Sequence, residues 1–181
     1  MARIVALVSL VVVLGLVNWS ILQKEEHLAN GRVVYLDLAP VDPRSLMQGD
    51  YMALNFRIGT EVRAALPKDQ EYRRWGHDVA ASDGFVIVKL DEKNIASYKE
   101  IYTNQTLADD EVLMRYRVRD GAVKFATNAF FFQEGNGEYY QPARYGQFRV
   151  DAKGELLLVA MYDKDLKRLE PAKTDNPEQS H

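Results

Sequence analysis

The sequence has no cysteine among its 181 residues. This absence excludes disulfide bonds, thiol catalysis, thiolate zinc sites and a lipidated N-terminal cysteine. It is compatible with an oxidising compartment and does not require one. Histidine is scarce too: there are three, His27, His77 and His181, and no two have the spacing of a metal-binding pair on a helix or hairpin. We therefore predict no metal site and no cofactor site.

The chain also lacks an excess of one charge. Its 23 Lys and Arg residues against 26 Asp and Glu residues give a formal net charge of -3, and the two signs are interspersed. A nucleic-acid partner is not expected, because it would require a basic face or stripe. A faint likeness to signal peptidases fails at the nucleophile, since Ser45 follows Pro43 where that pattern places the serine before the proline. No catalytic residue is assigned.

One long apolar run, residues 4–22, contains no charged side chain. As a helix it would be roughly 28 Å long, close to the hydrocarbon thickness of a bilayer. Trp19 lies near its far end, where an interfacial aromatic residue is favoured. A cleaved signal peptide is the alternative, but no small-residue cleavage site precedes Gln23. The run therefore predicts a retained N-terminal transmembrane helix.

The charges that flank this run predict its orientation. Arg3 precedes it, whereas Lys24 after it is offset by Glu25 and Glu26. Because cytoplasmic flanks carry the excess of Lys and Arg, we expect the N-terminus in the cytoplasm and the rest of the chain exported. The predicted location is the inner (cytoplasmic) membrane, single-pass, with the domain in the periplasm or another extracytoplasmic space. The lipid bilayer is thus the first predicted partner.

The chain divides into four segments. We predict a membrane anchor over residues 1–22, a short polar stalk over 23–32, an exported β-rich domain over 33–169 and a disordered tail over 170–181. The tail has two prolines and few apolar side chains. The stalk can extend the anchor helix by a turn or two, up to a stop at Asn30-Gly31.

Alternation of apolar and polar residues is the main signal within the domain. It predicts strands over residues 33–39, 51–58 and 111–119, and a compact apolar strand over 85–90. The residues expected to share the buried faces of the three alternating strands are Val34, Leu36, Leu38, Met52, Leu54, Phe56, Ile58, Val112, Met114, Tyr116 and Val118. Alternation with arginines over 111–119 is typical of an antiparallel strand with one wet face.

Turn residues connect further strands. Asp120-Gly121 favours a tight hairpin from 111–119 to 123–133, because both positions tolerate positive φ. Residues 151–154 connect an expected strand at 145–150 to another at 155–162. The remaining expected elements are a turn at 134–137, a short strand at 138–141 and short helices at 61–66 and 92–102. The predicted fold is mainly β, an antiparallel β-sandwich or an open β-barrel after the N-terminal helix.

A short motif carries a family resemblance. Gly49, Asp50, Tyr51, Leu54 and Phe56 follow the spacing of the GDYXXLXY motif, with Phe56 in place of the final tyrosine. The chain thus resembles the GDYXXLXY family of bacterial membrane-anchored proteins. The missing hydroxyl puts any role of that hydroxyl in doubt for this chain.

The resemblance extends to residues 143–150, which include Arg144 and Tyr145 as weaker candidate site residues. It implies an exported accessory protein with a multi-spanning membrane protein as a possible partner, and it implies no activity. From the residues themselves the motif has a structural account. Gly49 can supply positive φ, Asp50 can accept hydrogen bonds from turn amides, and Tyr51 then enters a strand.

Three functional hypotheses follow from the sequence. The first is a membrane-anchored accessory or interaction protein, held near a membrane partner by its anchor. The second is an extracytoplasmic ligand-binding or sensing domain, because the aromatic runs Phe130–Phe132 and Tyr139-Tyr140 could line a pocket instead of packing in the core. A hydrolase is the third.

Overall fold

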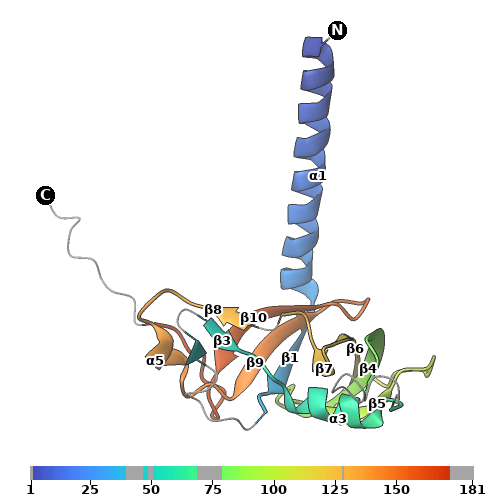
Figure 1. Ribbon diagram of the computed structural model, residues 1–181, viewed down its shortest axis with the longest axis vertical. Helices are drawn as coiled ribbons and strands as arrows, with labels where there is room; N and C mark the ends of the chain where they lie inside the picture. Colours follow the sequence, from blue (N-terminus) through green and yellow to red (C-terminus); the bar gives the residue numbers. More distant parts are fainter. Residues whose placement is uncertain (1, 40–46, 49–50, 69–78, 128, 172–181) are drawn as a thin grey trace, which may run out of the picture.

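The computed structural model describes residues 2–39, 47–48, 51–68, 79–127 and 129–171, with the backbone alone at 2–3, 6–8 and 47–48. A long helix leads into a β-rich domain (Figure 1). The helices are α1 (Ala2–Asn30), α3 (Arg57–Ala65) and α5 (Gly137–Tyr140). The strands are β1 (Arg32–Asp37), β2 (Met47–Gln48), β3 (Tyr51–Ala53), β4 (Ser82–Leu90), β5 (Ala96–Ile101), β6 (Glu111–Arg119), β7 (Ala122–Lys124), β8 (Ala129–Phe131), β9 (Tyr145–Val150) and β10 (Leu156–Tyr162).

Helix α1 stands away from the domain and touches it only near its C-terminal end (Figure 1). Its described apolar side chains are exposed, and residues 23–30, which are mostly polar, continue the same helix. At its base, the His27 Nε2 atom lies 2.9 Å from the Arg149 carbonyl oxygen, and Arg149 donates a hydrogen bond to the Gly31 carbonyl. Over the described residues, no helix is both long enough and apolar enough to cross a membrane.

The described strands form three antiparallel sheets, in the orders β1-β9-β10, β5-β4-β6-β7 and β2-β3-β8. The β-rich, antiparallel class predicted from alternation is therefore confirmed. The first two sheets meet where the Arg115 amide at the edge of β6 donates to the Gly154 carbonyl before β10.

One hydrophobic core underlies these sheets. Every residue predicted to lie on a buried face is buried, including Met52, Leu54, Phe56 and Ile58 around the motif. The alternation is clearest in β6, where Met114 and Val118 have no exposed surface, while Arg117 and Arg119 face solvent. This match between pattern and burial fixes which face of each strand carries the polar residues.

The two predicted hairpin turns are present. Asp120 and Gly121 have φ of 52° and 67°, as a tight turn between β6 and β7 requires. In the turn from β9 to β10, the Asp151 carboxylate accepts hydrogen bonds from the amides of Lys153 and Glu155, both at 2.9 Å. Gly154 closes that turn with φ of 79°.

The strand predicted over 51–58 is wrong in its second half. β3 ends at Ala53, and helix α3 starts at Arg57, earlier than the helix expected at 61–66. The buried positions explain the error, because Ile58 continues the period of two from Phe56 and also starts a helical spacing with Val62. One buried residue thus fits both patterns.

The helix predicted over 92–102 is also wrong, because this segment forms a turn and strand β5. The Asp91 carboxylate accepts hydrogen bonds from the amides of Lys93 and Ile95, each at 2.8 Å. Asn94 adopts φ of 60°, which ends any helical path and returns the chain alongside β4.

Two further strand predictions need correction. The strand expected over 123–133 is divided into β7 and β8, because Phe125 turns into the core and Ala126 adopts φ of 48°. The strand expected over 138–141 is the short helix α5. There only Tyr140 is buried, and it packs against Phe130 at a centroid distance of 4.9 Å.

Candidate functional site

The described residues of the motif lie partly in the hydrophobic core and partly beneath the surface. Leu54 and Phe56 are buried in the core, and Tyr51 starts strand β3. Gly49 and Asp50 lie outside the described residues, so the turn roles expected for them stay predictions.

Phe56 joins the motif to the second block of the sequence, residues 143–150. Its ring lies edge-on to Phe148 at 5.4 Å and to Phe125 at 6.5 Å between centroids. A Cβ atom placed on Gly146 would lie 3.2 Å from the Phe56 ring, so glycine makes room for that ring. The site predicted from the motif is thus, at Leu54 and Phe56, a packing site.

Tyr51 lies beneath an exposed surface of the domain. It pairs with Phe131 across β3 and β8, and the two rings lie 5.7 Å apart between centroids. Phe131 is 73% exposed, the highest value among the large apolar side chains of the domain described here. Strand β3 therefore supports the ring of Phe131, which lies outside the hydrophobic core.

Phe131 borders a groove of about 520 Å³ that is open to solvent. The groove lies between β6, β8 and the start of β10, near the end of the domain from which α1 departs (Figure 1). Its side chains are mixed, with apolar residues from β8 and β10 and two arginines from β6. The lining residues include Arg115, Arg117, Phe130, Phe131, Glu155 and Leu157.

The two groove arginines differ in their partners. Arg115 donates to Glu155 at 2.6 Å and lies 3.7 Å from the Asp83 carboxylate. The hydrogen bond to Glu155, and then its charge, raise the pKa of the Arg115 guanidinium, which stays protonated. Arg117 donates to the Ala126 carbonyl at 3.0 Å, and no described carboxylate lies within ion-pair distance of it. Within the described residues, the groove therefore has one guanidinium that forms no ion pair, because Asp83, opposite Arg117 in β4, is bound by Arg115 and Arg119.

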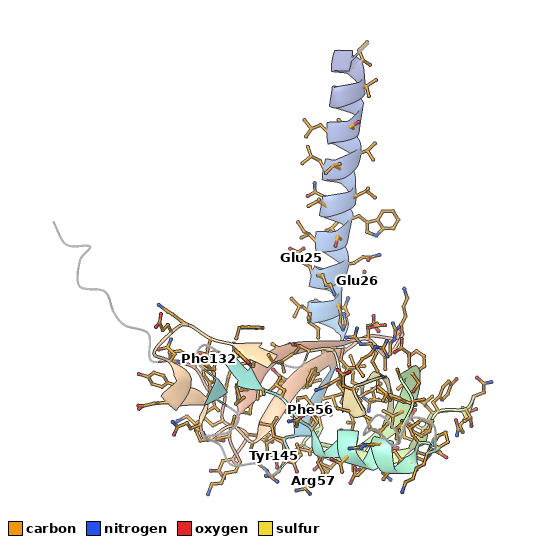
Figure 2. The ribbon with its side chains drawn as sticks, in the orientation of Figure 1. Glu25, Glu26, Phe56, Arg57, Phe132 and Tyr145 are labelled. Carbon is orange, nitrogen blue, oxygen red and sulfur yellow. The ribbon has the colours of Figure 1, made fainter. Side chains whose placement is uncertain are left out.

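A second charged cluster lies at the opposite end of the domain. Figure 2 shows Arg57 and Tyr145 on the side remote from α1. The Asp37 side chain, 14% exposed, lies 3.1 Å from Arg57 and 3.1 Å from a terminal nitrogen of Arg144. Arg144 Nε is also 2.9 Å from Asp37 Oδ1, although this pair lacks hydrogen-bond alignment. These contacts of Asp37 link β1 to the start of α3 and to the residue before β9.

Tyrosines and a glutamine cross the outer face of the β1-β9-β10 sheet. Gln147 donates to the Tyr35 hydroxyl at 3.1 Å and accepts from the Tyr162 hydroxyl at 3.2 Å. Burial, and next the neighbouring Tyr35, raise the pKa of Tyr162 above its ordinary value. The three side chains thus satisfy one another, which is the arrangement of a structural network.

Comparison with known proteins adds one finding. Residues 13–161 match the family of GDYXXLXY proteins, which spans most of the chain. The chain belongs to the GDYXXLXY family. No curated protein and no solved structure has a significant match to it. For this GDYXXLXY protein the family assignment inferred from the motif is therefore confirmed.

The predicted site residues do not form one site. Leu54 and Phe56 are in the core, Tyr51 is behind the groove, and Arg144 lies with Asp37 at the far end. Half-buried Tyr145 pairs with Asp37 across β1 and β9 and does not reach the groove. Over the described residues, no group of three or more His, Asp or Glu residues could hold a metal ion.

Sequence reasoning missed the groove. Alternation assigned Arg115 and Arg117 to the wet face of β6, which was correct, but gave no reason to single them out. Their importance comes from two segments distant in sequence, β8 and β10, that approach the same face. The nearest sequence signal was the run Phe130–Phe132, whose central ring is exposed while Phe132 stacks on Tyr140.

Proposed function

We propose that this GDYXXLXY protein is a membrane-anchored accessory protein whose domain acts outside the cytoplasm together with a membrane-embedded partner. Helix α1 supports this proposal above all, because its described apolar side chains are exposed and it projects from the domain. Counted on the sequence, the uncharged run 4–22 has the length to span a hydrocarbon layer. Exposed apolar surface on this scale needs an apolar environment or a partner.

The flanking charges support the direction of insertion. Arg3 precedes the run, and Glu25 and Glu26 follow it on the part of α1 nearest the domain (Figure 2). With the N-terminus in the cytoplasm, the domain lies on the outer side of the inner membrane, in the periplasm of a bacterium with two membranes. The rigid base of α1 then holds the domain close to other proteins of the same membrane.

A membrane extraction and protease assay on the full chain tests the anchor. We expect the protein to stay in the membrane after alkaline carbonate washing, and protease added to spheroplasts to digest the domain. Val13→Arg, at the middle of the run, should lower the fraction of protein that resists carbonate extraction, because an arginine there costs about 2.5–3.5 kcal/mol of insertion. Ile4→Arg, at the cytoplasmic end of the run beside Arg3, is the matched control and should stay in the membrane with its orientation unchanged.

Two results would contradict the proposal. One is a wild-type chain that carbonate extracts. The other is a domain that protease reaches only after the membrane is permeabilised, which would place it in the cytoplasm.

The groove favours a second candidate function, the binding or sensing of a ligand. Its volume of about 520 Å³ lies in the range of small-molecule sites. Its mixture of leucine and phenylalanine side chains with arginine suits a ligand with an apolar body and an anionic group. A crosslinking experiment from the groove separates a bound small molecule from a bound protein partner.

A further inference from the structure

The groove has strand edges for two of its walls. β10 pairs with β9 on one side, and along Leu156–Leu158 no described strand pairs with its other side. β8 pairs with β3, and its second edge also has no strand partner among the described residues. An exposed strand edge presents backbone N–H and C=O groups that can pair with another chain.

The side chains of the groove fit the same kind of occupant. Phe130, Phe131 and Leu157 provide apolar contacts, and Phe131 is held from behind by Tyr51. A strand added to an edge gains affinity from backbone hydrogen bonds and specificity from the contacts of alternate side chains. A lipid chain would use the apolar contacts but leave the backbone groups of both edges unpaired.

Charge selects among possible peptides. Arg115 is already paired with Glu155 and Asp83, so it contributes little net attraction. Arg117 is held at the groove by its hydrogen bond to the Ala126 carbonyl, and it forms no ion pair with a described carboxylate. Asp83, its cross-strand neighbour in β4, is bound by Arg115 and Arg119 instead. A carboxylate is the group that an unneutralised guanidinium binds most specifically.

The position of the groove suits a partner in the membrane. β10 begins next to the base of α1, since Leu157 pairs with Arg149 and Arg149 contacts His27 and Gly31. Residues 23–30 continue α1 for about 12 Å beyond the apolar run. A segment that leaves the membrane therefore reaches the groove within a few residues.

We propose that this groove binds an extended, acidic segment next to the membrane in a membrane-embedded protein partner. The segment lies as a strand along Leu156–Leu158 of β10, with an Asp or Glu side chain on Arg117. This inference rests on the proposed function, and it specifies which surface of the domain the partner occupies.

Photocrosslinking from the full chain in its native membrane tests the proposal. Phe131→p-benzoylphenylalanine places the reactive group at the groove, and its 73% exposure allows the larger ring. Tyr139→p-benzoylphenylalanine is the matched control, because Tyr139 is an exposed aromatic residue on α5 that does not line the groove. We expect a protein adduct from position 131 and none from position 139, with the attachment site in an acidic, non-helical segment beside a transmembrane helix.

Charge reversal makes the test specific. Arg117→Glu should lower the adduct yield at least about tenfold, because like charges at a contact cost several kcal/mol. Arg117→Lys should keep most of the yield. Changing the captured Asp or Glu of the partner to Lys should restore crosslinking to the Arg117→Glu protein. This rescue also excludes misfolding of the Arg117→Glu chain as the cause of the loss.

Three outcomes would overturn the inference: adducts with lipid or a small molecule only, no adduct at position 131, or a protein adduct that Arg117→Glu leaves unchanged. The first of these favours the ligand-binding alternative. If position 139 or another part of the domain captures the partner instead, the accessory function stands and only the groove assignment fails. If the anchor assay fails as well, the proposed function fails independently.

Discussion

Gly146 offers a sharp test of how the two sequence blocks pack. A Cβ atom at this position would lie 3.2 Å from Phe148, 3.2 Å from Phe56 and 3.3 Å from Leu158, all side-chain carbons. Phe148 is fully buried and Phe56 nearly so, so the rings have little space into which to move. Gly146→Ala should therefore overpack the core and destabilise the domain by about 1–3 kcal/mol.

The assay is urea and thermal unfolding of the full chain in detergent, followed by near-UV circular dichroism, which reports the packing of the domain aromatics. For a domain of this size the expected loss corresponds to a Tm lower by about 2–12 °C. Gly137→Ala is the matched control, since its nearest contacts, at 3.6 and 3.7 Å, are ordinary and its backbone has no positive φ. That variant should be neutral or slightly stabilised.

A double mutant separates overpacking from other causes. Phe56→Leu removes the ring atoms that face Gly146 and opens space for the new methyl group. The double mutant should therefore lose less free energy of unfolding than the two single mutants lose in total, with a coupling free energy of at least about 0.5 kcal/mol. An unchanged Tm in Gly146→Ala, or strict additivity with Phe56→Leu, would refute this account of the core.

Two further predictions concern charged groups. The hydrogen bond from Lys99 lowers the pKa of Glu111 below its ordinary value of 4.5. The ionised Glu111 therefore stabilises the fold above pH 4.5, and this stabilisation is lost as the pH falls through the lowered pKa. Glu111→Gln should lower the Tm at pH 7 and flatten the decline in Tm below pH 4.5; an unchanged acid decline contradicts this. At Asp37, Arg144→Gln should cost about 1–3 kcal/mol in urea unfolding. Arg57→Gln should cost under about 1 kcal/mol, because Arg57 is more exposed, and equal losses would refute the ranking.

Much of the fold was predictable because period-two alternation determines burial directly. β6 was predicted with its observed bounds, since its apolar residues alternate with arginines and Asp120-Gly121 ends it. The segment after β4 was not predicted correctly, because its conformation depends on one carboxylate. Asp91 binds two amides of the following turn, and no periodicity signals such a local hydrogen bond.

The candidate site was less predictable than the fold. The motif did locate β3, but its role in supporting Phe131 depends on pairing between residues 80 positions apart. Arg117 appears in the sequence as one of several arginines on a wet face. Its place in the groove depends on the edge of β10 that pairs with no described strand and on the Ala126 carbonyl, and no local sequence pattern contains either.

The close joint at Gly31 has a mechanical consequence. A Cβ atom there would lie 2.5 Å from the His27 carbonyl and 2.9 Å from Arg149, and β1 starts at the very next residue. Without a flexible linker, tilting α1 must tilt the whole domain with it. If α1 is anchored as proposed, the domain samples a narrow set of orientations, and binding the proposed partner costs less orientational entropy. A long Gly-Ser insertion after Gly31 would replace this rigid joint with a flexible linker. The domain would keep the same surface, but fewer of its encounters with the proposed partner would have the right orientation.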